Sequence, residues 1–151
     1  MNWLLAIATF YLALWFVVAF LAARISGWAA LVDVYRLSTP FNGKHWRVWH
    51  AELRYGSSYG FSNVGANPQG LYLAVNKLLP CHPPLLIPWT DVSISLTKGR
   101  WHTPWTLRFR RTHWEFRFRR VSGVYVRLTE KDGRQLTELA GSTGKALRPR
   151  S

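Results

Sequence analysis

The pattern of hydrophobic and polar positions divides the chain into one long apolar run and a mixed remainder. Residues 3–23 contain no charged side chain, whereas all 20 Lys and Arg residues and all 7 Asp and Glu residues follow this run. At about 1.5 Å rise per residue, a helix of this length spans roughly 30 Å, the thickness of the hydrocarbon core of a bilayer. The pattern therefore predicts a transmembrane helix over residues 3–23.

Two other structures could account for the same run. A cleaved signal peptide needs a basic start, a shorter apolar core and a small-residue cleavage site. Met1 and Asn2 supply no basic side chain, and only Ala22 and Ala23 resemble a cleavage site. A buried core helix is the other alternative, but an uncharged run of this length is long for one. A membrane-spanning helix is the favoured interpretation.

The distribution of basic residues predicts the orientation of this helix. Only the α-amino group precedes it, whereas Arg24, Arg36, Lys44 and Arg47 follow it closely. Basic residues are retained on the cytoplasmic side of a membrane. We therefore expect a protein of the cell inner membrane, with its N-terminus outside and its C-terminal domain in the cytoplasm. The single cysteine, Cys81, agrees with a reducing compartment.

The predicted transmembrane helix is rich in aromatic residues and has small side chains on one face. Small residues allow another helix to approach closely, although alanine is also common in membrane helices without such a role. The residues expected to pack in the membrane are Ala6, Thr9, Phe10, Ala13, Phe16 and Phe20. These residues favour one hypothesis for function: a small accessory subunit of a multisubunit membrane complex, whose helix packs against other transmembrane helices, lipids or pigments.

Residues 24–44 are expected to form a juxtamembrane helix and linker. Ser26 is a suitable cap for a short helix that reaches about Leu37, because apolar residues follow at helical spacing. Thr39-Pro40 should end it, since proline restricts the residue before it and cannot continue a helix. This helix either extends the membrane helix or lies along the membrane surface.

After residue 45 the apolar residues alternate with polar ones, which is typical of β-strands. The expected strands lie near residues 46–55, 59–66, 71–76, 92–97 and 124–128. Pro80-Cys81-His82-Pro83-Pro84 should be a loop. Thr129 is a suitable N-cap for a last helix that ends at Gly141. We therefore expect a domain over residues 45–141 and a basic flexible tail over residues 142–151.

Residues 105–120 give the clearest alternation. An antiparallel hairpin that pairs Phe109 with Trp114 also pairs Leu107 with Phe116 and Trp105 with Phe118. All six apolar side chains then share one face, and the other face carries arginines, among them Arg108 opposite Glu115. Such cross-strand pairs contribute roughly 0.2–1 kcal/mol each. The predicted fold is a single N-terminal transmembrane helix plus an α+β, mostly antiparallel β domain, a pleckstrin-homology-like barrel closed by a C-terminal helix.

Two segments carry a resemblance to a known group of proteins: Gly70-Leu71-Tyr72-Leu73, and His82-Pro83-Pro84-Leu85-Leu86-Ile87-Pro88-Trp89-Thr90-Asp91-Val92. With them the chain resembles small bacterial membrane-anchored proteins, mostly uncharacterised, whose soluble part is similar to pleckstrin-homology or GRAM-type domains. The resemblance covers residues 45–141. It implies the fold of the domain and no catalytic residues. The density of arginine between Arg100 and Arg120 is a feature of this chain that the resemblance does not imply.

That arginine-rich stretch supplies the predicted binding residues. They are Arg100, Arg108, Arg110, Arg111, Arg117, Arg119 and Arg120, with Glu115 as the single acid among them. Near an anionic leaflet each basic residue contributes about 1 kcal/mol. The sequence thus predicts a non-catalytic domain that binds anionic lipid headgroups or an acidic protein partner. The alternative is a solvated strand face that serves only to keep the domain in the cytoplasm.

Other functions are disfavoured by spacing and residue type. Nucleic-acid binding needs aromatic and basic residues on one surface, whereas here they alternate between two faces. Cys81 and His82 are adjacent, which is not the spacing of a structural zinc site. The carboxylates form no pair suited to acid–base chemistry, and no glycine-rich phosphate loop is present in the sequence. We expect no enzyme activity, no cofactor and no metal.

Overall fold

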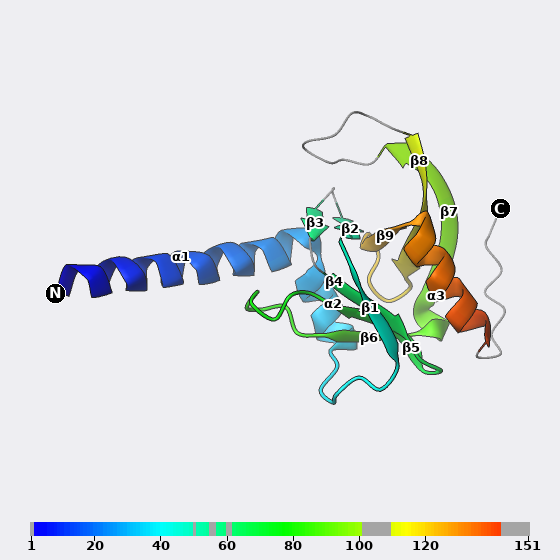
Figure 1. Ribbon diagram of the computed structural model, residues 1–151, viewed down its shortest axis with the longest axis horizontal. Coiled ribbons are helices and arrows are strands. Elements are labelled where there is room, and N and C mark those ends of the chain that lie inside the picture. The colour runs from blue at the N-terminus through cyan, green and yellow to red at the C-terminus, as the bar shows by residue number, and fades with distance from the viewer. Residues whose placement is uncertain (1, 50, 55–56, 60–61, 101–109, 143–151) are drawn as a thin grey trace.

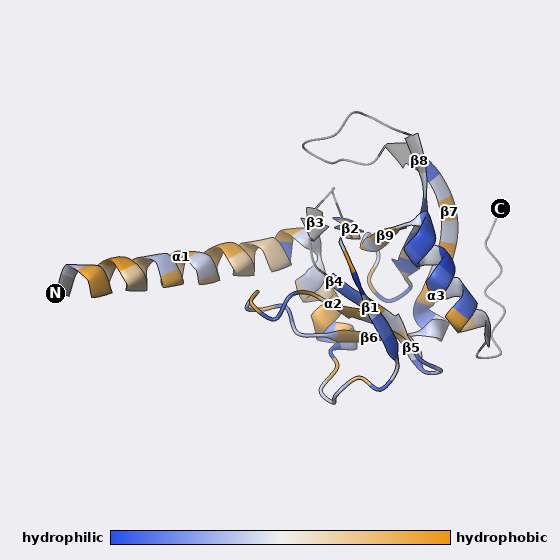
Figure 2. Ribbon diagram, viewed as in Figure 1, coloured by the Kyte–Doolittle hydropathy of each residue, from blue (hydrophilic) through white to orange (hydrophobic). Residues whose placement is uncertain are grey.

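The computed structural model describes residues 2–49, 51–54, 57–59, 62–100 and 110–142. Helix α1 (Asn2–Ser26) projects from a compact β domain (Figure 1) and is apolar along most of its length (Figure 2). Residues Trp3–Ser26 are long and apolar enough to cross a membrane, and only 6% of their most apolar window is buried. A core helix would be largely buried, so that alternative is wrong. A signal sequence near the N-terminus passes the same test of length and hydropathy.

The domain contains two antiparallel sheets. The first has the order β1 (Lys44–Val48), β4 (Ser62–Ala66), β5 (Gly70–Ala74) and β6 (Leu85–Pro88). The second has the order β3 (Ser57–Tyr59), β2 (Ala51–Leu53), β9 (Tyr125–Thr129), β8 (Arg110–Phe118) and β7 (Val92–Arg100). A 3-10 turn, η2 (Trp89–Asp91), leads from β6 in the first sheet to β7 in the second.

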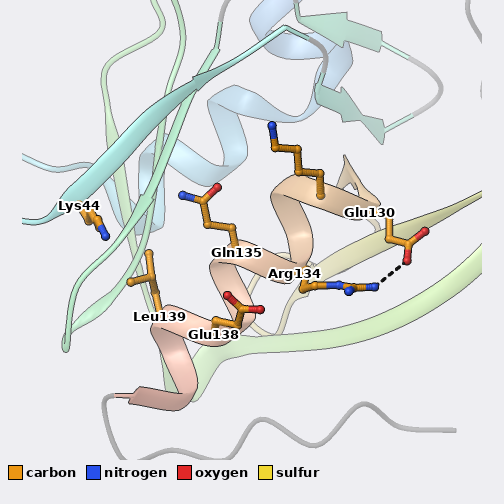
Figure 3. Close-up of a pocket in the computed structure, with 7 residues that line it drawn as sticks. Lys44, Glu130, Arg134, Gln135, Glu138 and Leu139 are labelled. Atoms are coloured by element: carbon orange, nitrogen blue, oxygen red, sulfur yellow. Dashed lines mark hydrogen bonds and ion pairs between the residues drawn. The ribbon is translucent and has the colours of Figure 1, made fainter.

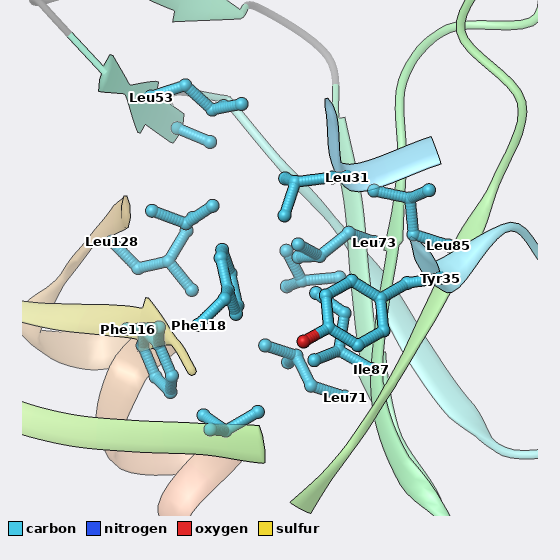
Figure 4. Packing of buried hydrophobic residues seen from close by; sticks show 14 of the residues in the cluster. Leu31, Tyr35, Leu53, Leu71, Leu73, Leu85, Ile87, Phe116, Phe118 and Leu128 are labelled. Carbon is cyan, nitrogen blue, oxygen red and sulfur yellow. The ribbon is translucent and has the colours of Figure 1, made fainter. Parts of the chain in front are cut away.

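The inner faces of the two sheets form one hydrophobic core (Figure 4). Leu71 and Ile87 of the first sheet and Phe116 and Leu128 of the second are fully buried. Helix α3 (Glu130–Ser142) closes one side of the core through Leu136. The predicted combination of antiparallel sheets and a C-terminal helix is confirmed. However, no ladder of hydrogen bonds among the described residues closes the two sheets into a barrel.

Helix α2 (Trp28–Tyr35) belongs to the same core. Its residues Trp28, Leu31 and Tyr35 lie on one face and are buried, as expected for an amphipathic helix that packs on a sheet. Gly27 separates α2 from α1 with a φ of 83°, and a β-carbon there would lie 2.6 Å from Val124. Helix α2, which lies in the segment expected to be a juxtamembrane helix and linker, thus contributes core residues to the domain.

The predicted hairpin register is wrong. β8 pairs with β7, so that Trp114 lies opposite Leu96 and Phe116 opposite Ile94. Its other edge pairs with β9. From His113 to Arg117 both edges of β8 are therefore occupied, which contradicts the expected pairs of Trp114 with Phe109 and of Phe116 with Leu107. The expected partner of Phe118 was Trp105. Those three partners lie outside the described residues. The sequence pattern favoured a hairpin between neighbouring segments. The ladder between β7 and β8 instead forms nine residue pairs and leaves β8 in the interior of the sheet.

Several local predictions are confirmed. The β5–β6 loop (residues 75–84) contains the proline-rich segment, and β7, β9 and α3 lie where alternation and helical spacing placed them. The hydroxyl of Thr129 accepts a hydrogen bond from the Asp132 amide at 3.3 Å, which is the predicted cap. β6 was not anticipated, because its four residues form a continuous apolar run that shows no alternation.

Gly133 is a position at which α3 packs tightly against Trp114 of β8. A β-carbon there would lie 2.3 Å from the Trp114 ring and 2.4 Å from its β-carbon, whereas one at Gly141 would meet nothing within 4 Å. We predict that Gly133→Ala lowers the free energy of unfolding by about 1–3 kcal/mol through overpacking, despite the better helix propensity of alanine. Gly141→Ala should be neutral or stabilising by up to about 1 kcal/mol. Thermal denaturation in mild detergent compares the two. Equal effects would contradict the packing role of Gly133.

Candidate functional site

The outer face of the second sheet carries a cluster of charged side chains with two buried acids, which we call the carboxylate cluster: Glu52, Glu115, Arg117 and Arg127. The register places Arg127 between Glu52 and Glu115 on neighbouring strands. Arg127 Nε donates to Glu115 at 2.8 Å, and Arg127 also lies 3.4 Å from Glu52. Arg117 Nε donates to the second Glu115 oxygen at 2.6 Å. Glu52 and Glu115 are almost completely buried.

The ionisation of this cluster follows from its hydrogen bonds. Burial alone would raise the pKa of Glu115, but hydrogen bonds from Arg127 and Arg117 outweigh it and hold this pKa below its usual value of 4.5. Burial opposes the charge of Arg127, yet the hydrogen bond to Glu115 raises the pKa of the guanidinium. Both side chains are therefore charged at neutral pH, and each neutralises the other inside the protein.

A third buried acid, Asp91, is paired with an arginine at the end of η2, directly before β7. Arg120 lies 3.0 Å from its carboxylate, and the Tyr35 hydroxyl donates to the same oxygen at 3.2 Å. The backbone amide of Arg119 donates to the Asp91 carbonyl at 2.8 Å. Burial is the main reason that the pKa of Tyr35 is raised. These contacts tie α2 to the turn that follows β8.

The exposed charge of the described residues is consequently basic. The exposed Lys and Arg residues are Arg24, Arg36, Lys44, Arg47, Lys77, Lys98, Arg117, Arg119, Arg120, Lys131 and Arg134. The exposed acids in this part of the chain are Asp33, Glu130 and Glu138. Because three of the seven acids are internal, the surface is more basic than the overall composition indicates.

The predicted arginines do not form one continuous free surface. Arg117 and Arg120 are exposed but held in ion pairs, whereas Arg119 forms no ion pair within the described residues. Arg100 and Arg110 lie opposite each other at the ends of β7 and β8. Arg111 is the next residue of β8, and Arg108 lies outside the described residues. The sequence did not indicate Arg127, because its partners come from distant strands.

The predicted membrane residues all lie on α1, apart from the domain. Phe10, Phe16 and Phe20 are exposed by 64%, 50% and 46%. Ala6, Ala13 and Thr9 are exposed as well, and the Thr9 hydroxyl donates to the Leu5 carbonyl at 2.8 Å. This hydrogen bond satisfies the only polar side chain among the six.

Two open grooves lie on the domain. One, of about 850 Å³, runs between Lys44 and the outer face of α3, where Glu130 and Arg134 form an ion pair of 2.9 Å (Figure 3). Because both acidic and basic side chains line this groove, it favours neither an anionic nor a cationic ligand. The other, of about 630 Å³, lies beside the β5–β6 loop, and its lining among the described residues includes Arg36 and Lys77 but no acid.

His82 and Cys81, the pair considered above for metal binding, have different environments. His82 is buried, with Nδ1 2.8 Å from the Pro80 carbonyl oxygen and its ring against Trp28. Cys81 is exposed. Among the described residues no group of three or more metal-ligating side chains occurs.

The burial of His82 predicts a pH dependence of stability. Desolvation lowers the pKa of His82 below its usual 6.5. Below that pH the unfolded imidazole binds a proton that the folded one does not, so the free energy of unfolding falls as the pH decreases. Thermal melts between about pH 7.5 and about pH 5 should show this decrease in the native chain and a smaller one in His82→Gln. The exposed His45 provides the control, His45→Gln. Unchanged pH dependence in His82→Gln would contradict the assignment.

Comparisons with protein-family models, curated proteins and solved structures give no match for this chain.

Proposed function

We propose that the protein is a non-catalytic, single-pass membrane protein whose basic cytoplasmic domain, a pleckstrin-homology-like domain, binds an anionic lipid surface. One observation carries this proposal: Glu52, Asp91 and Glu115 are internal and paired with arginine, whereas the exposed side chains of the described residues are mainly basic. This surface belongs to a domain joined through Gly27 to a helix that can cross a membrane.

The strand order supports a pleckstrin-homology-like arrangement. β1 and β2 follow each other closely in sequence but belong to different sheets, and the same holds for β3 and β4. The chain thus passes from one sheet to the other within each pair. β5 and β6 then extend the first sheet, β7, β8 and β9 form an antiparallel meander in the second, and α3 follows as the C-terminal helix.

The tether makes weak electrostatic binding effective. Each exposed basic residue close to an anionic leaflet contributes about 1 kcal/mol, and the attraction fades within a Debye length of about 10 Å. A domain held beside the bilayer experiences a high effective concentration of lipid, so strong intrinsic affinity is not required. Arg24 and the basic residues that follow support a cytoplasmic domain by the positive-inside rule.

Lipid retention tests the proposal on the full chain. The protein is purified in mild detergent with equal amounts of phosphatidylglycerol and phosphatidylcholine, and the bound lipids are counted by native mass spectrometry. We expect severalfold enrichment of phosphatidylglycerol. Lys98→Glu combined with Arg119→Glu should reduce this enrichment, whereas Lys98→Arg with Arg119→Lys should preserve it. Equal retention of both lipids by the native chain would overturn the proposal.

A second candidate function is an accessory subunit of a larger membrane complex. The exposed aromatic side chains of α1, among them Phe10 and Phe16, favour it, because nothing in the described part of the chain covers them. The same mass measurement separates the two functions. Stoichiometric co-purification of another membrane protein would support the subunit, and a lipid-bound monomer of 17.5 kDa would count against it.

A further inference from the structure

The groove beside the β5–β6 loop has the chemistry of an anion site. Arg36 and Lys77 lie at its edge, both exposed and without an ion pair among the described residues. Asn63 and Tyr72 provide polar groups from the outer face of the first sheet, and Leu79 contributes apolar surface. Two cations without a lining carboxylate complement a negatively charged group that carries an apolar portion.

The tip of the β5–β6 loop adds an independent observation. Leu78 is 76% exposed, the highest value among the large hydrophobic residues described. Asn76 holds the tip in a turn, because its side-chain oxygen accepts from the Leu78 amide at 3.1 Å and its carbonyl accepts from the Leu79 amide at 2.9 Å. An apolar side chain fixed beside Lys77 is suited to a membrane interface, where both apolar and basic groups are stabilised.

The loop also has a defined position relative to α1. It extends from the domain on the side from which α1 leaves (Figure 1). Its His82 ring packs on Trp28 with 5.8 Å between ring centroids, and the Leu37 amide donates to the Pro84 carbonyl at 2.9 Å. The loop therefore packs against α2 and the residues that follow it, and Gly27 connects α2 to α1. If α1 spans a bilayer, the loop tip faces that bilayer.

We propose that the β5–β6 loop contacts the membrane that α1 spans, with Leu78 entering the interface and the headgroup of an anionic phospholipid lying in the groove between Arg36 and Lys77. This inference rests on the proposed function and assigns one lipid headgroup to a defined place on the domain. The lipid phosphate supplies the negative charge that the two basic side chains bind, and the acyl chains of the lipid contact the apolar side chain at the loop tip.

The native Cys81 thiol, exposed in this loop, provides the probe. The full chain is reconstituted in nanodiscs of phosphatidylcholine alone or mixed with phosphatidylglycerol, and the rate of Cys81 modification by an uncharged maleimide is measured. We expect the rate to fall by about tenfold in the anionic discs, since two basic side chains favour contact with that surface. An equal rate in both discs would overturn the inference.

Paired variants localise the effect. Arg36→Gln with Lys77→Gln should abolish the difference between the two discs, and Leu78→Ser should reduce it. Lys44→Gln with Lys131→Gln changes the net charge equally, on exposed residues beside the α3 groove, and should leave the difference intact. Thermal melts establish that each variant folds. Equal responses of the two charge pairs would contradict a specific groove.

Two further measurements test whether the ligand is a lipid and whether the membrane contact lies at this loop. Inorganic phosphate added to the detergent-solubilised chain should not protect Cys81, and protection there would contradict the assignment to a lipid. Hydrogen exchange over the whole domain in the same nanodiscs distinguishes the two proposals. Unprotected Cys81 with protection elsewhere on the domain overturns this inference alone, whereas no protection anywhere overturns the proposed function as well.

Discussion

Glu115→Ala should lower the free energy of unfolding by about 2–4 kcal/mol, the largest effect expected of a single polar substitution in this chain. The Glu115 side chain is only 3% exposed and accepts hydrogen bonds from both Arg117 and Arg127. Its removal leaves Arg127, which is 21% exposed, with only the longer contact to Glu52. The cost comes mainly from an arginine that is largely removed from solvent and loses its closer partner. Chemical denaturation of the full chain in detergent micelles measures it.

The matched control is Glu130→Ala. Glu130 also forms an ion pair with an arginine, at 2.9 Å, but both side chains are more than half exposed. Pairs of this kind on a helix surface contribute about 0.3–0.5 kcal/mol. Similar losses for Glu115→Ala and Glu130→Ala would mean that the carboxylate cluster does not stabilise the domain.

Leu31→Ala should lower the free energy of unfolding by about 2–5 kcal/mol, because it leaves a cavity between α2 and the sheets. Leu31 is fully buried and faces Leu85 and other core residues (Figure 4). The control on the same helix is Val34→Ala, whose side chain is 41% exposed and should cost less than about 0.5 kcal/mol. The same denaturation measurement compares them. A small effect of Leu31→Ala would show that α2 is not part of the folded domain.

The sequence predicted those elements whose evidence is local. The uncharged run gave α1, alternation gave β5, β7 and β9, and Thr129 gave the start of α3. Strand pairing was harder to predict from the sequence, because the aromatic residues of β8 are compatible both with a hairpin to residues 105–109 and with a ladder to β7. Both registers place Trp114 and Phe116 on the same face, so alternation alone cannot choose between them.

The candidate site was predicted only in its overall charge. The basic surface follows from composition, but which arginines are free depends on contacts between distant strands. Glu115 was expected to pair with Arg108 across the hairpin, whereas its partners are Arg117, two residues away, and Arg127 on β9. The position of Lys77 beside Arg36 depends on how the β5–β6 loop packs against α2, which no spacing in the sequence indicates.

Hydrogen exchange on the full chain in nanodiscs tests most directly the proposal that the basic domain binds the surface of a membrane that α1 spans. Amide exchange is compared between discs of phosphatidylcholine and discs that also contain phosphatidylglycerol. We predict slower exchange in the anionic discs for segments around Arg36, Lys77 and Arg119, and loss of this protection in high salt. Identical exchange of the whole domain in the two kinds of disc would contradict membrane binding.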